Sequence, residues 1–254
     1  MAIVIPNFCI ALKRAQDCKA AMDLATSLQM YFRSKVNAFI IGGGQVSLPP
    51  NMTSVSVESH KNLANSFEQS ESDLLILPIS TENAAGGVVN ASEANKIIDQ
   101  LGRMVLTVPC PGGPFNFSKI IVPIDSSFET RQKVPYAIAM AKALGSVLVI
   151  LGVSNDKSAD SEVLINNYIR QVTANIQENG VRCVSEVRIG GNPTQQVLNF
   201  AKEIDAGMVV IMTEQEANLI SFFSGKYSQQ MVKASPIPVL SIHPKDLIVS
   251  DARL

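Results

Sequence analysis

The chain has 254 residues, a formal net charge of −1, 17% charged residues and 46% hydrophobic residues. This length suffices for one large hydrophobic core or two small ones. The lack of a basic excess argues against binding to double-stranded nucleic acid, and no apolar run approaches the roughly 18 residues of a membrane span. Residues 1–6 do not resemble a signal peptide, and the four cysteines show no CxxC spacing. We therefore expect reduced thiols and a cytoplasmic location.

Apolar runs and helical patterns alternate along the first half of the chain. The runs predict strands over residues 2–6, 36–41, 53–58, 73–79 and 104–108. Apolar positions three and four residues apart predict helices over residues 60–69 and 92–101. The segment Gly42–Pro50 is rich in glycine and ends in two prolines, so it cannot hold a helix.

A short segment separates the two halves. Residues 109–114 contain three prolines and two glycines, a composition typical of a linker. We expect one domain over residues 1–113 and a second over residues 114–254.

The second half shows a clearer alternation. Strands are predicted over residues 119–125, 146–153, 181–189, 206–212 and 238–242. Helices are predicted over residues 130–144, 161–179 and 225–234, and Asn192 and Pro193 open a further helix after the third strand. Strands that alternate with helices of this length predict a parallel sheet covered on both faces.

An offset of 117 residues relates the two halves. It aligns residues 2–6 with residues 119–123, Arg14 with Arg131, and Ala20 with Ala137. This similarity predicts two tandem repeats. At the same offset, Phe8 takes the place of Asp125.

Ligands of open parallel sheets bind at the carboxyl ends of the strands, which directs attention to four segments of the second repeat. Asp125 and Ser127 follow its first strand, Val153 ends the second, Gly190 and Gly191 follow the third, and residues 212–227 follow the fourth. Asp125 is suited either to accept hydrogen bonds from a base or ribose or to cap the next turn. The two glycines suit either a close approach of backbone to ligand or a tight turn.

Four segments of the second half resemble the universal stress protein family in their order and spacing. They are Ile-Ile-Val-Pro-Ile-Asp-Ser-Ser (120–127), Gly-Asn-Pro (191–193), Ser-Gly-Lys-Tyr-Ser (224–228) and Pro-Ile-Pro-Val-Leu-Ser-Ile (236–242). The first half resembles the family more weakly, through residues 3–6 and 73–77. The resemblance implies an α/β fold with two tandem open parallel-sheet domains of about five strands each, Rossmann-like and similar to the adenine nucleotide alpha hydrolases. It also implies that the final strands of the two domains pair, through Val105, Leu106, Val108, Val239, Leu240 and Ile242.

Many members of the resembled family bind ATP through the pattern Gly, two residues, Gly, nine residues, then Gly with Ser or Thr. Such glycines admit phosphates to backbone N–H groups. The corresponding residues here are Met212, Gln215, Gly225 and Lys226, followed by Tyr227 and Ser228, so one glycine of three remains. Glu214 and Glu216 add negative charge to the same loop, although Lys226 is placed to contact a phosphate if it is not simply solvated. The first repeat offers Phe8 and Ala91-Ser92, and we expect no nucleotide there.

Three functions stay open. The resemblance and the lost glycines favour a stress-response or regulatory protein that acts through protein interaction, without catalysis or a certain cofactor. The alternative is a switch that binds ATP or AMP in the second repeat, through Asp125, Gly190, Gly225, Lys226 and Ser228. A third possibility is a small-molecule enzyme, for which the candidate residues are Asp125, Glu214 and Glu216. Phe222 and Phe223 are suited either to packing or to a partner surface.

Overall fold

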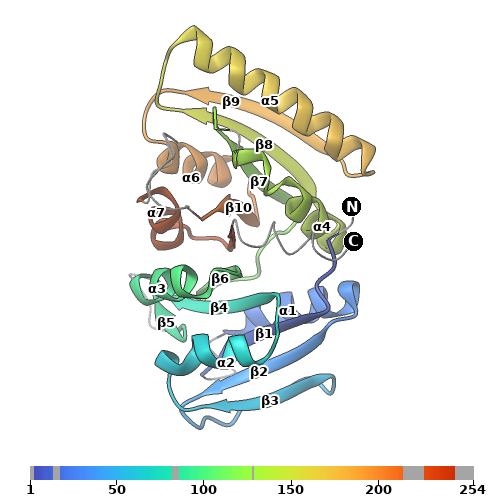
Figure 1. Cartoon of the computed structure of the whole chain (residues 1–254), viewed down its shortest axis with the longest axis vertical. Helices are drawn as coiled ribbons and strands as arrows, with labels where there is room; N and C mark the ends of the chain where they lie inside the picture. The colour runs from blue at the N-terminus through green and yellow to red at the C-terminus, as the bar shows by residue number, and fades with distance from the viewer. Residues whose placement is uncertain (1–2, 14–17, 82–85, 128, 214–225, 244–254) are drawn as a thin grey trace. The chain divides into compact units, whose positions relative to one another are not determined.

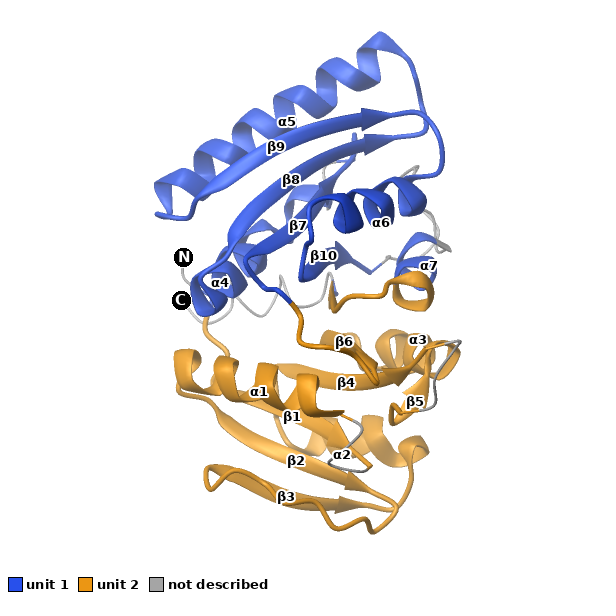
Figure 2. Cartoon of the chain, turned by 180° about the vertical axis from the view of Figure 1, so that it is seen from behind, with its two compact units in different colours: residues 1–3, 116–231, 242–254 blue, residues 4–115, 232–241 orange. Residues whose placement is uncertain are grey.

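The computed structural model describes residues 3–13, 18–81, 86–127, 129–213 and 226–243. The chain forms two compact units, which Figure 2 colours separately. Unit 1 contains residues 1–3, 116–231 and 242–254, and unit 2 contains residues 4–115 and 232–241. Each unit is described by itself.

Unit 2 is an open sheet with helices, shown in Figure 1 from blue to green. Its parallel strands follow the order β3-β2-β1-β4-β6. The elements are β1 (Asn7–Leu12), α1 (Lys19–Phe32), β2 (Lys35–Ile41), β3 (Met52–Val57), a 3-10 turn (His60–Asn62), α2 (Leu63–Gln69), β4 (Leu74–Ser80), β5 (Val89–Asn90), α3 (Ala91–Leu101) and β6 (Met104–Cys110).

The first strand of unit 2 is Asn7–Leu12, so the strand predicted over residues 2–6 is wrong. β1 lies between β2 and β4, which requires side chains that are buried on both faces. Residues 8–12 meet this requirement, whereas Val4 is 65% exposed. The offset of 117 residues is therefore wrong as well. Phe8 is a fully buried residue inside β1, and the residue that follows the strand is Lys13.

No helix joins β2 to β3, as the glycines and prolines of residues 42–50 predict. Gly42 and Gly43 both have a positive φ, of 71° and 72°, which glycine adopts without strain. Ser54 and Ser56 of β3 lie beside Ala38 and Ile40 of β2, and both serines are exposed. The face of β3 that bears these two serines is therefore polar, whereas a helix packed on it would require apolar residues.

Unit 1 contains the predicted alternation of strands and helices. Its parallel strands follow the order β10-β7-β8-β9. The elements are β7 (Lys119–Ile124), a 3-10 turn (Glu129–Arg131), α4 (Val134–Leu144), β8 (Val147–Ser154), α5 (Ala159–Glu178), β9 (Cys183–Ile189), α6 (Pro193–Glu203), β10 (Met208–Met212) and the start of α7 (Lys226–Ala234).

Helices cover both faces of the unit 1 sheet. A Cβ atom on Gly152 of β8 would lie 2.6 Å from Ile165 and 2.7 Å from Ile169, so α5 packs directly on this glycine. On the opposite face, Arg188 of β9 lies over the Phe200 ring of α6 at 4.5 Å and forms an ion pair with Glu203. The prediction of a doubly covered parallel sheet is confirmed.

The last strand of the chain, β11 (Val239–Ile242), contributes its first three residues to unit 2. Val239, Leu240 and Ser241 pair antiparallel with Thr107, Leu106 and Val105 of β6. The pairing of final strands that the resemblance implies is thus present within one chain. On its other side β6 pairs with β4, where Val108 lies beside Pro78. Val105 and Leu106 are therefore paired on both sides, with β4 and with β11, whereas the register pairs Val108 with β4.

Ile242, the last residue of β11, belongs to unit 1. Its carbonyl oxygen accepts hydrogen bonds from Thr213 there, at 2.8 Å from the backbone nitrogen and 3.3 Å from the hydroxyl oxygen. Among the described residues, none of the helices has the length and the apolar composition that a bilayer crossing requires.

Candidate functional site

Asp125 is the centre of a buried polar cluster at the carboxyl end of β7. It is 1% exposed. Its Oδ1 atom accepts hydrogen bonds from the backbone nitrogen of Ser127 at 2.9 Å and from the Ser127 hydroxyl at 2.6 Å. Its own backbone N–H donates to the Thr130 hydroxyl at 3.3 Å. Asp125 therefore caps the turn that leads to α4, one of the two roles that the sequence left open.

The second carboxylate oxygen of Asp125, Oδ2, is buried and accepts no hydrogen bond from the residues that the structure describes. A buried acceptor without a donor is costly, by about 1–3 kcal/mol. Such an atom is able to receive a donor from a ligand.

Lys133 lies in the same cluster and is 3% exposed. Its ammonium donates to the Thr130 carbonyl oxygen at 2.7 Å and to the Thr130 hydroxyl at 3.0 Å. Burial lowers the pKa of Lys133 to about 8, and the negative charge of Asp125 opposes this shift. Burial, together with the Asp125 charge, also raises the pKa of the Tyr227 phenol. A carboxylate, an ammonium group and a phenol thus share one desolvated region.

Lys133 is a member of this cluster that the sequence reading missed. A sequence pattern nevertheless indicates that Lys133 is buried. Lys133 stands at helical spacing from Ala137 and Met140, which are both buried. A lysine on the apolar face of a helix needs a partner inside the protein. The 3-10 turn between β7 and α4 supplies that partner, because Thr130 of this turn accepts both hydrogen bonds from the ammonium.

Gly190 and Gly191 form the turn between β9 and α6. Both have a positive φ, of 91° and 78°, and the Gly190 N–H donates to the Ser154 carbonyl oxygen at 2.6 Å. Asn192 then caps α6 by accepting a hydrogen bond from the Gln195 backbone nitrogen at 3.1 Å. A Cβ atom on Gly190 would lie 2.6 Å from Cε of Lys157. The aliphatic part of Lys157 therefore lies on the side of Gly190 toward which a side chain would project.

Three further predicted site residues lie in β8, β10 and α7. Val153 is fully buried within β8 and pairs with Arg188. Met212 ends β10 with a partly exposed side chain, and Ser228 lies in the first turn of α7. The structure thus brings together Asp125, Ser127 and Tyr227. Outside the described residues lie Glu214, Gln215, Glu216, Phe222, Phe223, Gly225 and the side chain of Lys226.

Among the described residues, no group of three or more histidine, cysteine or acidic side chains is arranged to hold a metal ion.

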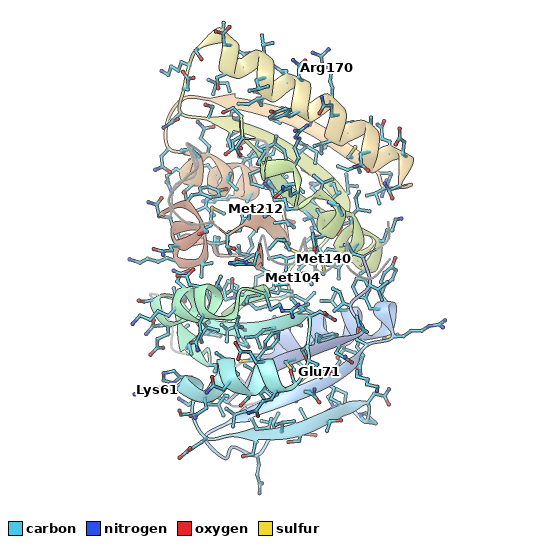
Figure 3. The ribbon with its side chains drawn as sticks, viewed as in Figure 1. Lys61, Glu71, Met104, Met140, Arg170 and Met212 are labelled. Carbon is cyan, nitrogen blue, oxygen red and sulfur yellow. The ribbon has the colours of Figure 1, made fainter. Side chains whose placement is uncertain are left out.

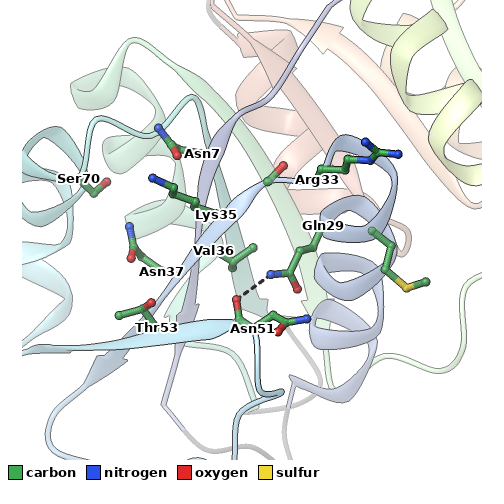
Figure 4. A pocket seen from close by; sticks show the side chains of 11 residues that line it. Asn7, Gln29, Arg33, Lys35, Val36, Asn37, Asn51, Thr53 and Ser70 are labelled. Atoms are coloured by element: carbon green, nitrogen blue, oxygen red, sulfur yellow. Dashed lines mark hydrogen bonds between the residues drawn. The ribbon is translucent and has the colours of Figure 1, made fainter.

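Unit 2 contains a hollow of its own at the amino ends of its strands. It has a volume of about 600 Å³ and is lined at the amino ends of three strands by Asn7, Lys35 and Thr53. Figure 4 shows these side chains on one side of β2 and Gln29 on the other, where the Gln29 amide donates to the Asn51 carbonyl oxygen at 2.8 Å. The sequence does not predict this hollow, because ligands of open parallel sheets are expected at the carboxyl ends of the strands.

Comparison with known proteins assigns the family. The family model described as "Universal stress protein family" matches residues 116–243, which is half of the chain. No curated protein has a significant match.

Among solved structures, PA1789 from Pseudomonas aeruginosa PAO1, a protein of unknown function, is 15% identical with a TM-score of 0.74, over 97% of this chain and 95% of that one. A universal stress protein from Archaeoglobus fulgidus DSM 4304 is 12% identical with a TM-score of 0.64, over 93% and 95%. A universal stress protein from Archaeoglobus fulgidus in complex with dAMP covers 50% of this chain and 98% of its own, at 15% identity and a TM-score of 0.42. On the strength of the family model, the chain belongs to the universal stress protein family.

Proposed function

We propose that this chain is a stress-response or regulatory protein that acts through protein interaction, without catalysis, and that its second repeat, residues 114–254, has largely lost the ability to bind ATP. The observation that carries the proposal is Met212. It ends β10, where the ATP-binding pattern of the family would have its first glycine. A methionine side chain at this point hinders the close approach of phosphates to the backbone.

The charges of the buried cluster support the same proposal. Lys133 supplies a positive charge to the neighbourhood of Asp125, and Ser127 donates two hydrogen bonds to its carboxylate. A cluster that carries its own cation and donors needs no ligand to balance the carboxylate. Lys157 would have to move before a ligand could approach Gly190 from the side of its Cβ direction.

One observation favours the alternative of an ATP- or AMP-binding switch. The Oδ2 atom of Asp125 is buried and receives no hydrogen bond within the described part of the chain. A donor on a bound base or ribose would remove this cost. Under this alternative, the predicted residues Asp125, Ser127, Val153, Gly190, Gly191, Met212, Gln215, Gly225, Lys226, Tyr227 and Ser228 form the site.

The nucleotide content of the purified protein separates the two functions. The protein is purified without added nucleotide and denatured with acid, and the supernatant is resolved by chromatography with detection of adenine. The proposal predicts only traces of adenine nucleotide. Stoichiometric AMP or ATP would refute it and support the switch.

A further inference from the structure

Strand β3 (Met52–Val57) forms one edge of the unit 2 sheet. It pairs with β2 through all six of its residues, and no other described strand of unit 2 pairs with it. Figure 1 shows β3 at the outer edge of unit 2, beyond β2. One row of its backbone N–H and C=O groups therefore faces outward.

The edge carries none of the features that usually prevent strands from pairing with another chain. Natural edge strands are protected by charged side chains, proline, bulges or a covering helix. Residues 52–57 contain no charged residue and no proline, and the helix that covers the equivalent strand of unit 1, α5, has no counterpart here. By contrast, β9 at the edge of unit 1 carries Glu186 and Arg188.

The sequence of β3 is complementary to itself in the antiparallel direction. A pairing centred on Val55 places Val55 opposite Val55, Ser54 opposite Ser56, and Thr53 opposite Val57. Odd-numbered residues of the strand lie on one face and even-numbered residues on the other. Thr53, Val55 and Val57 of both strands therefore meet on one face, and the serines meet on the other. Glu58, which follows the strand, faces Met52 rather than another Glu58, so no like charges oppose each other.

We propose that β3 is an interaction surface for a second copy of this chain, and that two copies join antiparallel through β3 about a two-fold axis centred on Val55. A second copy fits better than a charged peptide, because β3 offers no charge for such a peptide to recognise. A two-fold axis also closes the assembly, since each β3 edge is consumed by the other. Thr53, Ser54 and Ser56 are already exposed, so no local unfolding is needed.

Sedimentation velocity with charge-reversal variants tests the proposal. Ser54→Lys with Ser56→Lys places lysines opposite one another twice in the paired strands, and we expect the dimer dissociation constant to rise about tenfold or more. Ser54→Glu with Ser56→Glu should weaken association similarly. An equimolar mixture of the two double variants should associate again, because each lysine then faces a glutamate.

Val184→Lys is the matched control, because Val184 is an exposed residue of the other edge strand, β9, and should leave association unchanged. Circular dichroism confirms that each variant is folded. A wild type that stays monomeric at the highest concentration reached would overturn the proposal. So would a lysine variant that dimerises like the wild type, or a mixture that fails to associate.

Discussion

Ser127 holds the carboxylate of Asp125 by two hydrogen bonds to the same oxygen, from its backbone nitrogen at 2.9 Å and its hydroxyl at 2.6 Å. This arrangement fixes the orientation of Asp125 at the carboxyl end of β7. It also leaves Oδ2 as the buried carboxylate oxygen that accepts no hydrogen bond from the described residues.

Ser127→Ala removes the hydroxyl bond to a buried carboxylate. Because hydrogen bonds to charged groups are stronger than neutral ones, the free energy of unfolding should fall by about 1–3 kcal/mol. Urea denaturation at pH 7 measures the change. The control is Ser126→Ala, where a loss of less than about 0.5 kcal/mol is expected for a substitution away from such a feature. Equal losses in both variants would show that the Ser127 hydroxyl has no special role.

The buried ammonium of Lys133 should make stability depend on pH. Its pKa is about 8 in the folded protein, below the ordinary value of 10.5, so the folded state binds fewer protons than the unfolded state between these two values. The penalty for burying the charge is therefore full below pH 8 and is relieved as the pH rises. From pH 7 to pH 9, this group alone should add about 1 kcal/mol to the free energy of unfolding.

The comparison of Lys133→Met with Lys142→Met isolates this contribution. Lys142 is an exposed lysine of the same helix, so its variant should keep the rise in stability that the wild type shows. The Lys133 variant should lack it. Urea denaturation at pH 7, 8 and 9 measures the rise, and an identical pH dependence in the two variants would contradict the assignment.

Gly152→Ala tests the packing of α5 on β8. The added methyl group would lie within 2.7 Å of Ile165 and Ile169, which are both buried. Overpacking of this kind costs about 1–3 kcal/mol of unfolding free energy. Gly113→Ala is the control, because a Cβ atom there meets nothing within 4 Å. Thermal or urea denaturation in which Gly152→Ala proved as stable as the wild type would show that α5 moves aside easily.

Much of the fold follows from the sequence, because strands buried on both faces read as short apolar runs. Val147–Ser154 and Leu74–Ser80 are examples, and both were predicted to within one residue. The first strand was misplaced because residues 2–6 and 7–12 are two consecutive apolar runs. Only pairing with β2 and β4 decides between them, and that pairing joins residues far apart in the chain.

The candidate site was predictable only in part. Asp125 and the glycine turn follow from their places after strands, a local feature. The buried state of Lys133 and the position of Lys157 over Gly190 depend on how helices and loops pack, which local patterns do not specify. The membership of Tyr227 in the cluster likewise depends on how α7 places this side chain relative to Asp125.

Calorimetric titration with ATP and magnesium tests the central proposal most directly. The wild type, Asp125→Ala and Asp99→Ala are compared, since Asp99 is an exposed carboxylate of unit 2 and serves as the matched control. Our account predicts no binding heat for any of the three up to millimolar ATP. Micromolar binding by the wild type and Asp99→Ala that Asp125→Ala loses would contradict the account, and would make the second repeat a nucleotide switch.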